Sequence, residues 1–538
     1  MHDCQEKGTP PTLIAAVSVA LLALNSVAAA QAQQAEAAAQ TDARRFDVAE
    51  YVVKGNTVLD ARSIEKAVTP FLGPQRTLQD LEAARDALLA AYQAKGYQSV
   101  YVDVPQQPMT GGVVYLLVSE TKVGRVRVVG AKYSSPLAVR DQVPALKQGE
   151  VPDFNQAQAE LTALNRSGAR QVMPLVKQGS LPGTMDVDLK VEDSKPWRTS
   201  MGLNNDSSPD TEDLRALASL GYDNLWQRAH SASVSFFVAP QDPDETNVWS
   251  ASYIAPIGAN WSLETSGYIS DSDVATVGGT TVLGKGHSVG LKATYTAPMT
   301  GAWWHSWSAG VDFKDNDEAL TFDNAGDFVP LRYAPITVAY SGFTQTERLQ
   351  LALGSSAVIG TRSFFGYNSN SAQFDYKRYK ASPSFLVLKS DVNATYTFGN
   401  ELQLGLRLAG QITDSPLVSS EQIAAGGMNS VRGYLSAEAT GDYGVVGSLE
   451  FRTMPLNWFT PWVDSWRAYV FTDAGHLRIT DGLPEQDSEF TLFSAGLGTT
   501  FRIAQYITAR LDVGYPIETS LRTERDEPKV NFSLNASY

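Results

Sequence analysis

A tract in which apolar and polar residues alternate covers the C-terminal part of the chain, from Trp197 onward. The alternation is clearest at residues 288–295, 401–412 and 506–515, where nearly every second side chain is apolar. Successive side chains of a β-strand point to opposite faces, and strands of about ten residues with one apolar face are typical of transmembrane β-barrels. A soluble β-sandwich also alternates, but a sandwich of more than about 340 residues would be unusually large. We therefore predict an antiparallel transmembrane β-barrel at residues 195–538.

The number of strands follows only loosely from the length of this tract. About sixteen strands allow roughly 21 residues for each strand with its connection, and about fourteen or eighteen strands fit as well. The last strand alternates strictly and ends on an aromatic residue, with Phe532, Leu534, Ala536 and Tyr538 on one face. Bacterial barrels typically end in this way. We expect these four residues to be the signal that the barrel-assembly machinery reads, and an ordinary last strand is the alternative.

The first 30 residues have the pattern of a bacterial signal peptide. An apolar, alanine-rich run from Leu13 to Ala30 ends in small residues suited to cleavage. A membrane anchor of about 18 residues is the alternative. The single cysteine, Cys4, lies before this run, so cleavage leaves a mature chain without thiols for disulfides or metal sites. Residues 31–45 follow as a short Ala/Gln-rich segment.

Between the signal and the barrel, one series of predicted elements occurs twice, at residues 46–120 and 121–194. Each copy has the order strand, helix, helix, strand, strand, and the glycine after the first strand recurs as Gly55 and Gly130. The expected elements are strands at 46–59, 98–104 and 112–120 with helices at 60–72 and 78–95, then strands at 123–131, 170–176 and 185–191 with helices at 136–143 and 155–166. We predict two small α+β domains whose short sheets expose edges that can accept a guest strand. Spacer domains that bind nothing are the alternative.

Charge and motifs argue against catalysis and against a nucleic-acid partner. The net charge is −15, and no basic stripe of the kind that contacts phosphates is present. The five histidines lack metal-ligand spacing, and no complete glycine-rich phosphate loop, with Ser or Thr after its lysine, occurs. Residues 286–290 match the serine-hydrolase pattern, but Ser288 lies inside an alternating strand with no helix after it. We expect no catalytic residue, no metal and no cofactor.

Two short motifs in the barrel tract are more specific. A long connection at residues 413–443 contains Val431, Arg432, Gly433 and Tyr434 in succession, and two predicted strands later come Phe471, Asp473 and Gly475 with one residue between each pair. With these motifs the sequence resembles the TpsB transporters of two-partner (type V) secretion, the haemolysin secretion and activation family of the outer-membrane assembly superfamily. The resemblance implies sixteen strands, a loop that folds back into the barrel, and an arginine at its tip that meets the aspartate.

The resemblance also extends to the N-terminal region. The two repeated units look like polypeptide-transport-associated (POTRA) domains, and residues 89–105 resemble the pattern of the first of them. Many members begin with a helix that plugs the pore, but residues 31–45 leave no room for such a helix and its linker. For the pair Arg432 and Asp473 we expect a water-filled, screened setting in which it contributes about 1 kcal/mol or less and acts as a positional latch. An arginine that contacts only solvent is the alternative.

By resemblance, the protein lies in the outer membrane of a Gram-negative bacterium, surrounded by lipid, with its POTRA domains in the periplasm. It is expected to bind an unfolded partner exoprotein, β-helical and encoded nearby, and to translocate it to the cell surface without ATP. One alternative is a factor that inserts clients into the outer membrane. A passive porin is a weaker alternative, because a porin needs neither POTRA domains nor the arginine loop.

Overall fold

The computed structural model describes residues 45–108, 111–165, 170–272, 275–277, 280–282, 285–316, 319–322, 325–328, 330–456 and 463–538. The predicted signal peptide, and the Ala/Gln-rich segment apart from Arg45, lie outside the described residues. No helix in these ranges is long and apolar enough to cross a bilayer. The chain divides into two compact units, one largely N-terminal and one holding the C-terminal tract, and each is described by itself.

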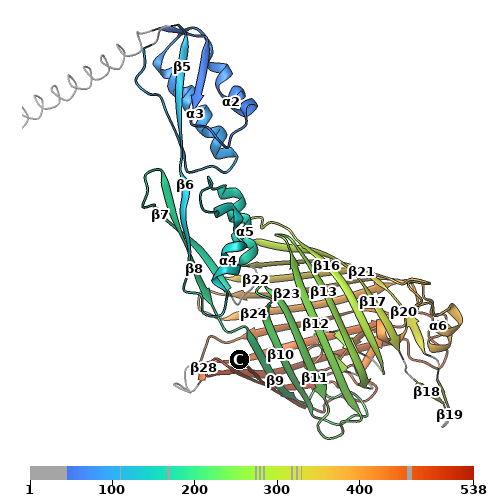
Figure 1. Cartoon of the computed structure of the whole chain (residues 1–538). Coiled ribbons are helices and arrows are strands. Elements are labelled where there is room, and N and C mark those ends of the chain that lie inside the picture. Colours follow the sequence, from blue (N-terminus) through green and yellow to red (C-terminus); the bar gives the residue numbers. More distant parts are fainter. Residues whose placement is uncertain are drawn as a thin grey trace, which may run out of the picture. The chain divides into compact units, whose positions relative to one another are not determined.

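The first repeated unit is a small sheet with two helices (Figure 1). The central strand β5 pairs in parallel with β2 and antiparallel with β4. Asp60 caps the first helix by accepting a hydrogen bond from the Ser63 backbone. The elements are β1 (Phe46–Val48), β2 (Glu50–Lys54), α2 (Ala61–Val68), η1 (Thr69–Phe71), β3 (Gly73–Arg76), α3 (Leu78–Ala94), β4 (Val100–Asp103) and β5 (Val113–Glu120).

The start of this unit differs from the prediction. The strand expected at residues 46–59 is two strands, because the backbone amides of Ala49 and Glu50 both donate to the Gly112 carbonyl and turn the chain there. The first piece, β1, pairs with β3, which the sequence did not predict. Gly73 and Gln75 adopt positive φ angles of 129° and 55° around β3. This irregular backbone explains why periodicity failed to indicate the strand.

The second unit repeats the topology of the first. Strand β8 is central, with β6 parallel to it on one side and β7 on the other. Asp188 on β8 accepts hydrogen bonds from Arg127 on β6 and Lys177 on β7, and these bonds hold the pKa of its carboxyl well below the usual range. The elements are β6 (Lys122–Val129), α4 (Pro136–Asp141), η2 (Pro144–Leu146), α5 (Phe154–Leu164), β7 (Arg170–Gln178) and β8 (Thr184–Asp193).

The repeated glycine has the same structural reason in both copies. Gly55 has φ +89°, and a Cβ placed on it would lie 2.2 Å from the Val118 carbonyl oxygen. Gly130 has φ +86°, and a Cβ there would lie 2.6 Å from the Val191 carbonyl oxygen. A side chain is excluded twice over at these turns, by the backbone angle and by the neighbouring strand. The repeat predicted from spacing is therefore a repeat of backbone geometry.

Helix α3 begins with a reciprocal cap that can be tested. The Asp80 amide donates to Thr77 Oγ1 at 3.3 Å, and the Thr77 amide donates to Asp80 Oδ2 at 2.8 Å. We expect Thr77→Ala to lower the stability of this domain by about 1 kcal/mol, because one orphan amide loses its acceptor. Limited proteolysis of the N-terminal domains, which reports the opening equilibrium, measures the change. Thr77→Ser keeps the hydroxyl, and equal cleavage rates for the two variants would contradict the capping role.

The C-terminal tract is a closed antiparallel barrel of sixteen strands within the described residues. Segments β20 and β21 together make one of these strands, since both pair with β17. The first half consists of β9 (Trp197–Asn204), β10 (Arg215–Leu225), β11 (His230–Val238), β12 (Thr246–Ile257), β13 (Trp261–Ser272), β16 (Gly286–Thr296), β17 (Trp303–Asn316), and β20 (Leu331–Tyr333) with β21 (Ile336–Gln345). The second half consists of β22 (Leu349–Ile359), β23 (Leu386–Thr397), β24 (Gln403–Thr413), β27 (Tyr443–Arg452), β28 (Val463–Arg478), β29 (Glu489–Ile503), β30 (Ile507–Pro516) and β31 (Lys529–Ser537).

The remaining elements lie in the connections between strands. Each of three connections holds a two-stranded ribbon, and one holds a helix that Figure 1 shows beside β20. They are β14 (Ala275–Val277) with β15 (Thr280–Val282), β18 (Ala319–Phe322) with β19 (Ala325–Phe328), β25 (Ile423–Ala425) with β26 (Ala439–Gly441), η3 (Ser419–Glu421) and α6 (Ser371–Lys377).

The barrel confirms the alternation read from the sequence. Leu406 and Leu408 are 40% and 43% exposed on the outer surface, while the polar Gln411 of the same strand is buried at 2%. Strand β31 closes the barrel by pairing with β9, from Ser533 opposite Asn204 to Ser537 opposite Ser200. Every neighbouring pair of strands around the closed barrel is antiparallel, so adjacent strands run in opposite directions.

Candidate functional site

The connection between β24 and β27, residues 414–442, folds into the barrel and is named the lumen loop here. Strands β25 and β26 pair antiparallel to make its stem, with Ala425 opposite Ala439. Its tip packs in a cluster with side chains of the wall. The cluster contains Ala425, Val431, Tyr434, Ala439, Val446, Leu477 and Leu492.

Glycines let the tip turn tightly and lie close to the wall. Gly426 has φ +110°, and a Cβ on it would meet the Leu435 carbonyl oxygen at 2.2 Å. Gly433 has φ +96° and lies against Gly514 of β30. A Cβ on Gly514 would lie 2.5 Å from the Gly433 nitrogen and 2.8 Å from the Arg432 carbonyl carbon. The backbone of the loop tip and that of β30 therefore touch, because neither Gly433 nor Gly514 has a side chain.

Arg432 and Asp473, predicted to meet, are in direct contact. Arg432 Nε and Nη2 each donate to a different oxygen of Asp473 at 2.7 Å, and the Arg432 backbone amide donates to the same carboxylate at 3.0 Å. Arg432 Nη1 donates to Glu450 Oε1 at 2.6 Å, and Nη2 donates to Ser448 Oγ at 2.9 Å. The Phe471 ring lies under the guanidinium, 3.5 Å from its carbon to the ring centre. This is a forked, multiply bonded site of a kind that lysine cannot reproduce.

Acidic side chains of the barrel wall balance the positive charge of Arg432, and further arginines balance those acids. Asp512 Oδ1 lies 3.6 Å from Arg432 Nη1, which makes three acidic groups close to this cation. Two further arginines face the same acids: Arg452 contacts Glu450 at 2.6 Å, and Arg510 contacts Asp512 at 2.7 Å. Three arginines and three carboxylates thus form one network, which is how charge can be held in a desolvated place.

We expected water to screen the pair Arg432 and Asp473, and this prediction is wrong. The side chains of Arg432 and Asp473 are both 0% exposed. The cause is the tip itself, since Val431 and Tyr434 are also fully buried and exclude solvent from the contact. Removing one partner of a buried, hydrogen-bonded pair costs about 3–5 kcal/mol, far more than the same step costs at an exposed pair.

The remaining motif residues shape the same contact. A Cβ on Gly475 would lie 3.2 Å from a Val431 methyl and 3.3 Å from the Ala425 methyl, so this glycine makes room for the tip. The Tyr434 hydroxyl lies 2.7 Å from the Glu518 carbonyl and accepts a hydrogen bond from the Phe493 amide at 3.2 Å. Tyr434 therefore joins the loop to β29 and to the connection after β30.

The Tyr434 hydroxyl gives a second testable effect. We expect Tyr434→Phe to lower the stability of the barrel by about 1 kcal/mol, because the partly buried hydrogen bond from the Phe493 amide loses its acceptor. The urea concentration that abolishes the heat-modifiable gel shift measures this effect. Tyr515→Phe is the matched control, since the Tyr515 hydroxyl contacts Asp526 at an exposed position. Equal urea midpoints for the two variants would contradict the role of Tyr434.

The C-terminal residues lie apart from this network. Leu534 and Tyr538 are 46% and 61% exposed on the outer face, where Ala536 is also exposed and Phe532 is half-buried. The Tyr538 backbone pairs with that of Thr199, next to the β9–β31 contact. These positions are compatible with an exposed recognition segment, which stays a prediction.

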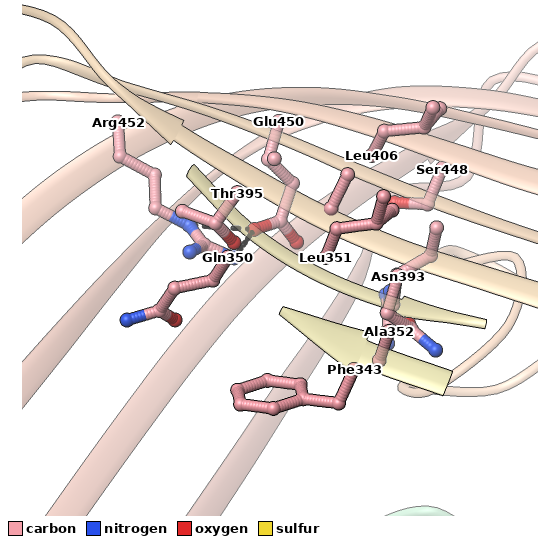
Figure 2. A pocket seen from close by; sticks show the side chains of 13 residues that line it. Phe343, Gln350, Leu351, Ala352, Asn393, Thr395, Leu406, Ser448, Glu450 and Arg452 are labelled. Carbon is pink, nitrogen blue, oxygen red and sulfur yellow. Dashed lines mark hydrogen bonds and ion pairs between the residues drawn. The ribbon is translucent and has the colours of Figure 1, made fainter. Parts of the chain in front are cut away.

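A recess of about 270 Å³, lined by both polar and apolar side chains, adjoins the Arg432 network. Glu450 and Ser448, which hold Arg432, are also part of its lining, together with Asn393, Gln350 and Arg452 (Figure 2). The residues of the recess come from adjacent strands, β21 to β24 and β27. The inner wall beside the loop therefore presents amides and charged groups, an arrangement suited to a polar chain.

Several members of the site were missed in the sequence. Ser448, Glu450, Tyr469 and Asp512 all contact Arg432 or its partners, yet none belongs to a motif. The available signal was the alternation, because Asp512 falls on the polar face of a predicted strand. Alternation tells which side chains face inward, but it does not tell which of them the loop reaches.

Comparisons with known proteins agree with this architecture. The family described as haemolysin secretion/activation protein ShlB/FhaC/HecB matches residues 183–501, and the ShlB-type POTRA domain matches residues 46–121. The outer membrane transporter CdiB of Escherichia coli is 23% identical over 500 residues, covering 89% of this chain and 81% of that protein. The outer membrane transporter CdiB of Dickeya dadantii is 22% identical, covering 92% and 87%. The solved structure of CdiB from Escherichia coli superposes with a TM-score of 0.62 at 20% identity, covering 93% of this chain and 91% of that one.

Proposed function

The chain belongs to the haemolysin secretion/activation protein family and is an outer-membrane transporter with periplasmic POTRA domains, and from this premise we propose that it secretes an unfolded partner protein. The partner is captured by the POTRA domains, passes through the barrel and folds at the cell surface. Residues 1–30 serve as the export signal and Phe532, Leu534, Ala536 and Tyr538 as the assembly signal. The observation that carries the proposal is the lumen loop, whose tip is fixed by a buried charge network instead of being free in the pore.

Capture is supported by the open edges of the two small sheets. The strand orders β2-β5-β4 and β6-β8-β7 leave an edge strand on each side of each sheet. An extended segment can add to such an edge through backbone hydrogen bonds, which demand little of its sequence. The partner is proposed to be a β-helical exoprotein, as the family resemblance implies, and a strand-rich chain suits this mode of binding.

Passage is supported by the inner wall beside the loop. The recess with Asn393, Gln350 and Arg452 offers hydrogen-bond donors and acceptors to an unfolded backbone. Residues 279–286 have the glycine and lysine spacing of a phosphate loop, but Gly286 stands where the motif requires Ser or Thr, and the transport is therefore proposed to proceed without nucleotide hydrolysis. Folding of the partner outside the cell supplies the direction.

The test is secretion of an exoprotein encoded beside this gene, in cells that make the transporter or lack it. We expect the exoprotein in the medium only when the transporter is present. The abundance of other outer-membrane barrels is measured in the same cells. Exoprotein appearing equally without the transporter, together with loss of other barrels, would overturn secretion and favour a factor that inserts clients into the membrane.

A further inference from the structure

The lumen loop also contacts the barrel at a second place, on strands other than those that bind Arg432. Glu421 in η3 is only 2% exposed, and Lys314 of β17 donates to its Oε1 at 2.6 Å. The Tyr333 hydroxyl of β20 donates to the same oxygen at 2.8 Å. The neighbouring Ser420 hydroxyl accepts a hydrogen bond from Asn316 of β17 at 3.0 Å. Side chains of the barrel wall therefore bind two successive residues of the loop, Ser420 and Glu421.

The loop backbone is positioned for this contact. Gln411 of β24 donates from its amide to the Glu421 carbonyl and to the Asp442 carbonyl, both at 2.9 Å. The Asp442 carboxylate accepts hydrogen bonds from the Leu417 amide at 3.0 Å and from the Thr480 amide at 2.7 Å. These bonds hold the two ends of the loop together where it enters the barrel. Glu421 is therefore presented to Lys314 by a fixed stem.

Apolar packing covers the Glu421 side of this second contact, where the carboxylate side chain is 3% exposed and that of Lys314 is 17% exposed. Leu417 and Val418 of the loop are 1% and 4% exposed. They pack with Tyr333 and with Phe374 of α6, in a cluster that also contains Leu331, Val358, Ala381, Phe385 and Val387. Breaking an ion pair in such surroundings leaves a charge that water cannot easily reach.

The two contacts involve different strands of the barrel. Arg432 binds residues of β27 and β28, whereas Glu421 binds β17 and β20, and the strands β22, β23 and β24 lie between these two pairs in the closed order. The loop thus contacts the barrel wall at two separate places. Releasing one contact leaves the loop tethered at the other.

We propose that Glu421 and Lys314 form a second latch, which positions the lumen loop across the pore together with the Arg432 network. Glu421 and Lys314 are positioning residues for the transport proposed above, on which the functional meaning of the latch rests. The loop leaves the pore only when both contacts open. An unfolded chain that displaces the loop must therefore disrupt two ion pairs at separate places on the barrel wall.

The experiment uses the purified full-length protein in planar lipid bilayers, with no exoprotein present. The conducting fraction of time is compared for wild type, Glu421→Ala, Arg432→Ala and the double variant. We expect a small increase for each single variant and, for the double variant, an increase at least about tenfold larger than the sum of the two. Glu421→Gln keeps a hydrogen-bonding group beside Tyr333 but removes the charge that faces Lys314, so its conducting fraction is expected to lie between those of wild type and Glu421→Ala.

A matched control and a second readout make the result specific. The pair Lys292 and Glu264 joins two wall strands at 2.7 Å, and Glu264→Ala is expected to change conduction little in either background. For the readout, Val418→Cys in a Cys4→Ser background is labelled with a maleimide, which should react about tenfold faster when Glu421 is alanine. Heat-modifiable mobility verifies assembly, and Lys314→Met with Glu421→Met keeps apolar packing if the alanine variant does not assemble.

The latch would be refuted if Glu421→Ala matched the Glu264→Ala control in conduction and labelling, alone and combined with Arg432→Ala. Because neither readout needs the exoprotein, this result is distinct from a failure of the proposed secretion. Secretion could fail its own test while the latch variants still open the pore, and in that case the latch stands without that role.

Discussion

Arg432→Ala is expected to abolish secretion of the partner while the barrel still assembles. The variant leaves Asp473, Glu450 and Asp512 with fewer cations than carboxylates, in a place from which the loop tip excludes water. Losing one partner of such a buried set costs about 3–5 kcal/mol, which corresponds to a change of at least about a hundredfold in the seating of the loop. The measurement is the amount of exoprotein in the medium relative to the amount of heat-modifiable barrel.

Two variants serve as controls for this prediction. Arg432→Lys keeps the charge but loses the forked contact with Asp473, and we expect secretion well below wild type. Arg198→Ala removes an arginine from an exposed pair with Asp223 at 2.7 Å, where an effect of about 1 kcal/mol or less is expected. Normal secretion by Arg432→Ala would show that the network does not seat the loop.

Gly514→Ala is expected to displace the loop tip without changing any charge. A methyl group at this position would lie 2.5 Å from the Gly433 nitrogen, so the backbone of the tip must move away from β30. Overpacking of this kind costs about 1–3 kcal/mol, and we expect a clear fall in secretion together with easier labelling of the tip. The measurements are exoprotein in the medium and the reaction rate of an Asn429→Cys reporter with a maleimide.

The matched control for Gly514→Ala is another strand glycine. A Cβ on Gly410 of β24 would meet only the Gly444 carbonyl oxygen, at 3.5 Å, which is ordinary contact. Gly410→Ala should secrete at the wild-type level. If the two alanine variants behave alike, close packing of the Gly433 backbone on Gly514 does not govern the loop.

Much of the fold could be predicted because it rests on periodicity. Side chains that alternate between lipid and lumen leave a period of two in the sequence, and the alternating segments at 401–412 and 506–515 lie within a few residues of the observed β24 and β30. The small domains were predictable because their helices begin at good caps such as Asp60. The strand number was not predictable in this way, since connection lengths vary and several numbers fit the same length.

Only the part of the site that belongs to the two motifs could be predicted from the sequence. The contact between Arg432 and Asp473 followed from the resemblance, but its burial did not, because burial depends on how Val431 and Tyr434 close over it. The contact between Glu421 and Lys314 could not be predicted from the sequence either. They lie more than a hundred residues apart, and only the closed barrel brings one wall strand to the returning loop.

The central claim is that an unfolded partner passes through the barrel lumen beside the Arg432 loop. The most direct measurement is site-specific photo-crosslinking in cells, with the exoprotein stalled by a tightly folded domain fused to its C-terminus. The photo-reactive residue replaces Asn393 in the recess or Leu408 on the outer surface of the neighbouring strand. We predict crosslinks to the stalled exoprotein from position 393 and none from position 408. Crosslinks from position 408 alone, or from neither position while secretion proceeds, would contradict passage through the lumen.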